Sequence, residues 1–160
     1  MKTAIVYISK YGTTQKVANK IKEYLSADEV VLNDLSLNSA IPLEQYDRII
    51  LGSSIYAGKV NKKFSTFCLE KESLLKGKEI GLFICGMIPQ PSEQQKELHE
   101  SFSTTLLEHA KAKAFLGGEF LMDKMNLVDR MIIKMVAKQS VNHSDINKEG
   151  IRSFVEELNT

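Results

Sequence analysis

Short runs of aliphatic residues alternate along this chain with longer segments whose apolar residues recur at helical spacing. The short runs occupy residues 3–8, 29–32, 47–52, 79–85 and 113–120. Continuous apolar runs of this length are typical of strands buried on both faces. The helical segments are 13–25, 62–75, 147–158 and one that opens at Ser92, has Gln95 in a capping-box position and carries apolar residues as far as Leu107. The alternation predicts an α/β fold, a doubly wound parallel sheet of five strands with helices on both faces.

The composition is that of an ordinary globular domain, and it excludes several other classes of protein. The chain has 160 residues, 43% of them hydrophobic, which predicts a single domain over 1–160 with one well-buried core. Lys and Arg number 21 against 20 Asp and Glu, so we expect no nucleic-acid partner. Cys68 and Cys85 lack the spacing of a metal site and predict free, structural thiols in a reducing compartment. There is neither a signal peptide nor an apolar run of about 18 residues, so we expect a cytoplasmic protein.

One segment exceeds what the simple alternation needs, and it lies between the fifth predicted strand and the last helix. Asn126 is placed to cap a helix over 126–138. The apolar side of this helix consists of Val128, Met131, Ile132, Met135 and Val136, and the cationic side of Arg130, Lys134 and Lys138. Two interpretations stay open. The helix packs on the sheet edge with a solvated cationic side, or its methionines grip a planar hydrophobic ligand while its cations contact anionic lipid headgroups.

The loop after the first predicted strand carries the clearest chemical signal. Ser9, Thr13 and Thr14 supply hydroxyl groups, and Gly12 allows close approach of the backbone at the start of a helix. Free N–H groups and the positive end of the helix dipole favour an anion there, and a phosphate fits best. The loop is neither a Walker loop nor the dinucleotide G-x-G-x-x-G motif. The alternative is a plain strand-to-helix turn in which a threonine caps the helix.

With this loop in first position, the whole chain resembles the flavodoxin family. The resemblance implies a strand order of 2-1-3-4-5 and one FMN bound noncovalently beyond the first and third strands. It implies three groups of FMN-binding residues. The phosphate loop is Ser9, Lys10, Tyr11, Gly12, Thr13 and Thr14; one side of the ring is lined by Ser53, Ser54, Ile55, Tyr56, Ala57 and Gly58; the other side is lined by Cys85, Gly86 and Met87.

Two further stretches are similar to the menaquinone-dependent protoporphyrinogen IX dehydrogenases, a branch with the same fold. They are residues 46–55 followed by Gly58, and residues 129–135 in the extra helical segment. The resemblance implies an FMN-dependent oxidoreductase, possible substrates being a quinone or a porphyrinogen-like molecule. Independently of the resemblance, the cationic side of the 126–138 helix allows peripheral contact with the inner face of the membrane.

Two other functions stay open at this point. The first is a flavodoxin-type electron carrier that acts only on redox partner proteins. The second is a phosphate-binding domain without FMN. In either redox function the flavin supplies the chemistry, so the sequence predicts no catalytic amino-acid residue and no metal.

Overall fold

The central sheet has the predicted parallel order. The computed structural model describes residues 1–26, 28–121, 123–136 and 143–160. The parallel strands are β1 (Lys2–Ile8), β2 (Glu29–Asp34), β3 (Arg48–Tyr56), β5 (Glu79–Cys85) and β6 (Ala112–Phe115), in the order β2-β1-β3-β5-β6. A two-residue strand, β4 (Lys59–Val60), folds back antiparallel on the end of β3. Counted without β4, this is the predicted order 2-1-3-4-5, and that prediction is confirmed.

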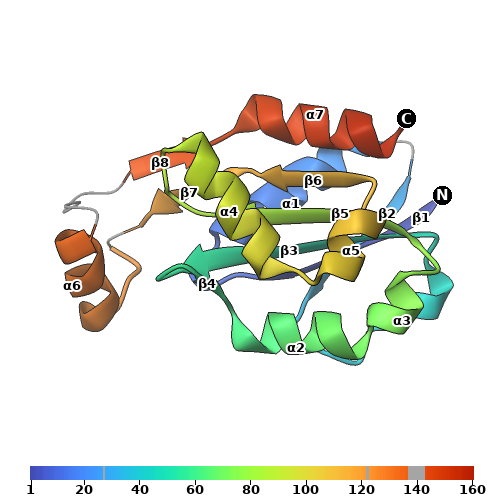
Figure 1. Ribbon diagram of the computed structural model, residues 1–160, viewed down its shortest axis with the longest axis horizontal. Helices are drawn as coiled ribbons and strands as arrows, with labels where there is room; N and C mark the ends of the chain where they lie inside the picture. Colours follow the sequence, from blue (N-terminus) through green and yellow to red (C-terminus); the bar gives the residue numbers. More distant parts are fainter. Residues whose placement is uncertain (27, 122, 137–142) are drawn as a thin grey trace.

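Helices cover both faces of the sheet (Figure 1). One face carries α1 (Thr13–Tyr24) and α7 (Lys148–Leu158); the other carries α2 (Lys62–Glu70), α3 (Glu72–Leu75), α4 (Pro91–Ser101) and α5 (Thr104–His109), with a 3-10 turn at Leu43–Gln45. Successive strand residues therefore point into two different cores: Ile49 belongs to the cluster under α2–α5, and Ile50 to the cluster under α1 and α7. This double burial explains why the strands read as continuous apolar runs.

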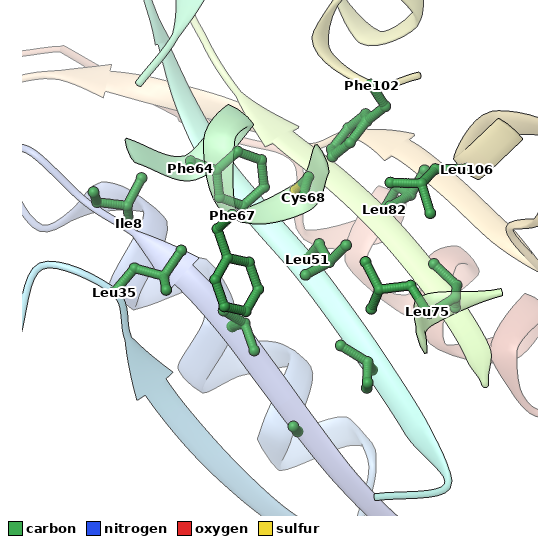
Figure 2. Packing of buried hydrophobic residues seen from close by; sticks show 14 of the residues in the cluster. Ile8, Leu35, Leu51, Phe64, Phe67, Cys68, Leu75, Leu82, Phe102 and Leu106 are labelled. Atoms are coloured by element: carbon green, nitrogen blue, oxygen red, sulfur yellow. The ribbon is translucent and has the colours of Figure 1, made fainter. Parts of the chain in front are cut away.

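Aromatic side chains from the helices fill the larger core. Figure 2 shows Phe64 and Phe67 of α2 packed over β1 and β3, with Phe102 beside them. The Phe64 and Phe102 rings meet edge to face, with centroids 5.9 Å apart. Burying each such side chain contributes about 1.5–3 kcal/mol to stability. The packing requires glycine at position 52, because a Cβ atom there would lie 2.0 Å from the Phe83 ring.

Several predicted elements are shorter than expected, and each has a local cause. The helix predicted over 62–75 breaks at Lys71 into α2 and α3. The helix predicted from Ser92 breaks at Phe102, and Ser103 caps the new helix α5 by accepting the Leu106 N–H at 3.2 Å. The capping box predicted for Ser92 and Gln95 is wrong: α4 begins one residue earlier, at a proline, a residue suited to the first helical position because it has no N–H to leave unpaired.

The fifth predicted strand, 113–120, divides into two strands at Leu116. Gly117 has φ 78° and turns the chain out of the main sheet. The second half, β7 (Gly117–Phe120), pairs antiparallel with β8 (His143–Ile146), a strand that the sequence did not predict. The pair stands at the carboxyl ends of the main strands (Figure 1).

The predicted helix between the fifth strand and the last helix exists as α6 (Leu127–Val136). Asn126 caps it as predicted, because its side-chain oxygen accepts the Asp129 N–H at 2.8 Å. The predicted end, Lys138, lies outside the described residues. Figure 1 shows α6 set apart from the sheet, and its Leu127, Val128, Met131 and Met135 are exposed. The interpretation that its apolar side packs on the sheet edge is therefore wrong. None of the described helices is long and apolar enough to span a membrane.

Candidate functional site

A cavity of about 640 Å³ opens at the carboxyl ends of β1, β3 and β5. Five parts of the chain form its walls: the loop after β1 with the start of α1, the end of β3 with its turn into β4, the loop after β5, Glu97 of α4, and the β7–β8 pair with Met125. Every predicted site residue lines this cavity except Gly12 and Ser53. Ser53 is fully buried within β3, and Gly12 bonds within the loop itself, where its N–H donates to Ser9 Oγ.

Gly12 sets the shape of the loop after β1. It adopts φ 96°, a left-handed conformation that favours glycine, and its N–H donates to Ser9 Oγ at 3.0 Å. It is also the residue that precedes α1, and no side chain caps that helix. The interpretation of this loop as a plain threonine-capped turn is therefore wrong, because Thr13 and Thr14 are the first two residues of α1 rather than its cap. The first-turn N–H groups of α1 remain available for an anion.

Glu119 of β7 engages part of this loop. Thr13 Oγ1 donates to Glu119 Oε1 at 3.1 Å, and Lys16 Nζ lies 3.0 Å from the same oxygen. Burial acts to raise the pKa of Glu119, but hydrogen bonds from Lys16, Ser144 and Thr13 and the charge of Lys16 outweigh it and lower the pKa. A buried carboxylate therefore stands beside the hydroxyl-rich loop in its charged form.

Asp129 of α6 is a second carboxylate at the same loop. Lys10 Nζ lies 2.6 Å from Asp129 Oδ2, and the Tyr11 hydroxyl donates to the same oxygen. The Asp129 side chain is only 6% exposed, while Lys10 also lies over the Tyr56 ring, 4.4 Å from its centroid. Asp129 of α6 thus faces the loop after β1, while Leu127, Val128, Met131 and Met135 of the same helix are exposed.

The turn after β3 forms another wall. Ala57 and Gly58 have φ 50° and 77°, the left-handed geometry of a tight hairpin turn, and they lead directly into β4. Both are exposed at the rim, while Tyr56 is half-buried beside them. The turn gives the cavity an aromatic wall with an open edge.

The loop after β5 approaches the β7 backbone closely. The Gly86 N–H donates to the Gly117 carbonyl at 2.9 Å, and a Cβ atom on Gly118 would lie 2.8 Å from Gly86 O. Gln94 of α4 donates to the Ile88 carbonyl at 2.7 Å and holds the far end of the loop. Cys85 is buried, and burial raises the pKa of its thiol to about 12, in keeping with the structural role predicted for it.

Sequence reasoning missed several residues of the cavity wall: Ile88, Pro89, Gln90, Glu97, Gly118, Glu119, Met125 and Asp145. The Gly117–Gly118 pair inside a predicted strand was a usable signal, since adjacent glycines often mark a close backbone approach. Glu97 gave no signal, because a glutamate on an otherwise polar helix looks like a surface residue.

Three buried polar atoms on these walls have no hydrogen-bond partner: Thr14 Oγ1, Tyr56 Oη and Glu97 Oε2. These residues come from three different elements, α1, β3 and α4, and all of them line the same cavity. Buried polar atoms without protein partners are uncommon, and a group of them around one cavity indicates that a polar ligand completes their bonding.

A family model described as flavodoxin domain matches residues 4–147. The chain belongs to the flavodoxin family. Among curated relatives, protoporphyrinogen IX dehydrogenase [quinone] of Escherichia coli K12 is 22% identical, over 99% of this chain and 91% of its own. Flavodoxin 2 of the same strain is 26% identical, over 99% of this chain and 95% of its own.

Solved flavodoxins share the fold. Flavodoxin 2 of Bacillus cereus matches with a TM-score of 0.61 and 24% identity, covering 99% of this chain and 98% of its own. A Fusobacterium nucleatum flavodoxin, solved bound to flavin mononucleotide, matches with a TM-score of 0.57 and 14% identity, covering 99% of this chain and 96% of its own. The chain has two features beyond the predicted five-stranded sheet and its helices. The β7–β8 pair lines the cavity, and α6 contacts the loop after β1.

Proposed function

We propose that this cavity binds one FMN noncovalently and that the protein is an FMN-dependent oxidoreductase. The observation that carries the proposal is the buried Thr14 hydroxyl at an uncapped helix start, on the wall of a large cavity, where the weakly bonding Cys85 thiol is its neighbour. Family membership and the FMN-bound solved flavodoxin support the same ligand. When bound, FMN supplies the redox chemistry by accepting and returning electrons singly or in pairs.

The residues divide by the part of the cofactor that they would hold. Ser9, Thr14 and the first N–H groups of α1 take the phosphate, with Gly12 permitting the close approach. The segment Ser54–Gly58 lines one side of the ring, and Cys85, Gly86 and Met87 line the other. The side chains of Lys10, Tyr11 and Thr13 already interact with Asp129 or Glu119. We therefore assign them to holding the shape of the loop and balancing its charge. No side chain is needed as a nucleophile.

Within this class, we favour a dehydrogenase that passes electrons from a porphyrinogen-like molecule to a quinone. The support is the relative named protoporphyrinogen IX dehydrogenase and the apolar part of the cavity wall made by Met87, Ile88 and Met125. Apolar side chains there exclude water from the site and contact a planar hydrophobic substrate.

The alternative is an electron carrier that reacts only with redox partner proteins. The relative named flavodoxin 2 favours it, as does the exposed turn at Ala57 and Gly58, which leaves one edge of the cavity open to a partner. Anaerobic reduction of the bound flavin by protoporphyrinogen alone distinguishes the two, because a carrier requires its protein partner.

Peripheral contact with a membrane belongs to the same proposal. The apolar side chains Leu127, Val128, Met131 and Met135 project outward from α6, with Lys124 and Lys134 exposed nearby. Such a helix is suited to the interface of an anionic bilayer. Cosedimentation with vesicles containing anionic lipid tests this, and replacing Met131 and Met135 by serine is expected to abolish it.

The test of the FMN proposal uses Thr14→Val, which removes the hydroxyl with little change of shape, and Thr66→Val on the exposed side of α2 as a matched control. FMN and riboflavin are titrated into cofactor-free protein, and binding is followed by quenching of flavin fluorescence. We expect Thr14→Val to weaken FMN binding about tenfold and to leave riboflavin, which has no phosphate, unchanged. Equal loss of both ligands, or no loss of either, contradicts the assignment of the loop.

A further inference from the structure

Glu97 stands apart from the other carboxyl groups of the cavity. It lies on α4, is only 7% exposed, lines the cavity, and its Oε2 has no hydrogen-bond partner. The nearby Ser101 hydroxyl donates to the Glu97 backbone carbonyl at 2.6 Å, so it does not satisfy the side chain. When a residue lines a ligand cavity and its buried carboxyl oxygen has no partner in the protein, the ligand is the expected hydrogen-bond partner.

The charges around Glu97 differ from those around Glu119 and Asp129. Lys16 and Lys10 hold those two as carboxylates at the phosphate end of the cavity. Among the described residues, no cation forms an ion pair with Glu97. On its own helix, Glu100 and Glu93 act on Glu97 through their charge, and Lys96 precedes it in the chain. The elements that contact α4 contribute Lys59 of β4, which is exposed, Lys113 of β6, whose ammonium donates to the Leu107 carbonyl, and Glu79 and Cys85 of β5.

These surroundings favour the neutral acid. Burial raises the pKa of Glu97, and the negative charges of Glu100 and Glu93 raise it further. Two carboxyl groups in one site whose pKa values are shifted in opposite directions act in different protonation states. The lowered pKa of Glu119 favours its anion, whereas the raised pKa of Glu97 favours a proton that it can donate in a hydrogen bond.

We propose that Glu97, in its neutral form, donates a hydrogen bond to an uncharged carbonyl oxygen of the ligand in this cavity. The inference rests on the proposed redox function of the site and goes beyond it by assigning a ligand-binding residue that sequence analysis did not find. The carbonyl belongs either to the flavin ring or to a second molecule of the quinone class. Both present the same acceptor, and the experiment separates them.

The experiment compares wild-type protein with Glu97→Gln, Glu97→Leu and, as a control, Glu108→Gln on the exposed side of α5. Isothermal titration calorimetry measures the affinity for riboflavin in cofactor-free protein and for menadione, a neutral quinone, in protein with and without FMN. Each titration is repeated between about pH 5 and about pH 9, a range that brackets a carboxyl with a raised pKa.

The expected result is a wild-type affinity that falls as the pH rises through the pKa of Glu97, by up to about tenfold per pH unit. Glu97→Gln retains a donor, so it binds with similar affinity at every pH. Glu97→Leu binds about three- to tenfold more weakly than the wild type at low pH and is also independent of pH. Glu108→Gln keeps the wild-type dependence. A dependence seen with riboflavin assigns the carbonyl to the flavin ring, and one seen only with menadione assigns it to the second molecule.

Two results overturn the inference. A wild-type profile that matches Glu97→Leu for both ligands shows that Glu97 does not donate to either. An affinity that instead increases with pH shows that the ionised carboxylate is the binding form. If wild-type protein binds no flavin at any pH, the proposed function fails, while the menadione titration of cofactor-free protein still decides the role of Glu97.

Discussion

Glu119 engages two groups that a phosphate at the same loop would otherwise use, Thr13 Oγ1 and Lys16 Nζ. A carboxylate with a lowered pKa beside an anion site also repels a phosphate directly. The two effects have the same sign, so we expect Glu119 to weaken FMN binding while it joins β7 to α1.

We therefore expect Glu119→Gln to bind FMN about five- to tenfold more tightly than the wild type, with no change for riboflavin. The measurement is a flavin fluorescence titration with both ligands, and Glu157→Gln on the exposed side of α7 is the control for loss of a negative charge. Weaker FMN binding by Glu119→Gln would mean that Glu119 supports the phosphate loop rather than competing with the phosphate.

Glu97 also makes folding stability depend on pH. Its pKa is raised in the folded protein, so the folded state holds a proton that the unfolded state releases. The stability contribution is complete below the unfolded-state pKa and is lost as the pH rises through the folded-state value. We expect Glu97→Gln to raise the free energy of unfolding by at most about 1 kcal/mol near neutral pH, and by less at acidic pH. Urea denaturation at several pH values measures this, and a gain confined to acidic pH would contradict it.

The helix α6 is attached to the loop after β1 by polar contacts. Its contacts to the loop after β1 run through Asp129, Lys10 and Tyr11. We expect Asp129→Asn to weaken this attachment, so that the amides of 127–136 exchange with deuterium about tenfold faster while those of the sheet do not change. Glu70→Gln on the exposed side of α2 is the control. Unchanged exchange in α6 would show that other contacts hold it.

The elements also show what a sequence can and cannot predict. The five parallel strands were predictable because double burial leaves a continuous apolar run, and Gly12 with its neighbouring hydroxyls was predictable because an anion site needs both. The strand β8 has only one apolar residue, Ile146, and gave no periodic signal. The periodicity of α6 identified its apolar side but not the direction of that side, which depends on the Asp129 contacts from residues more than a hundred positions away. Glu97 was missed for a similar reason, since its burial arises from tertiary packing.

At the scale of the whole molecule, a buried ion-pair network and the cavity lie at opposite ends of the sheet. Arg48 begins β3, is 3% exposed, and bonds to Asp28 at 3.0 Å, Glu79 at 2.6 Å and the Leu158 carbonyl at 2.8 Å. One guanidinium thus joins the start of β3 to β5, to the residue before β2 and to the end of α7. The cavity lies at the other end of the same strand.

We expect Arg48→Met to lower the free energy of unfolding by about 3 kcal/mol, because it leaves the partly buried Asp28 without its cation and Glu79 with only Lys111, at 3.5 Å. Affinity for FMN should stay within about twofold of the wild type, since position 48 lies at the far end of β3. Thermal and urea denaturation together with an FMN titration check both parts, with Arg152→Met, an exposed arginine on α7, as control. A large loss of FMN affinity in the folded variant would show that the two ends of the sheet are coupled.

The central claim is that the cavity holds FMN, and the visible absorption spectrum of the purified protein tests it most directly. The account predicts the two absorption bands of a bound flavin, and release on heating of a chromophore that mass spectrometry identifies as FMN, one per chain. A colourless protein that also fails to bind added FMN would contradict it.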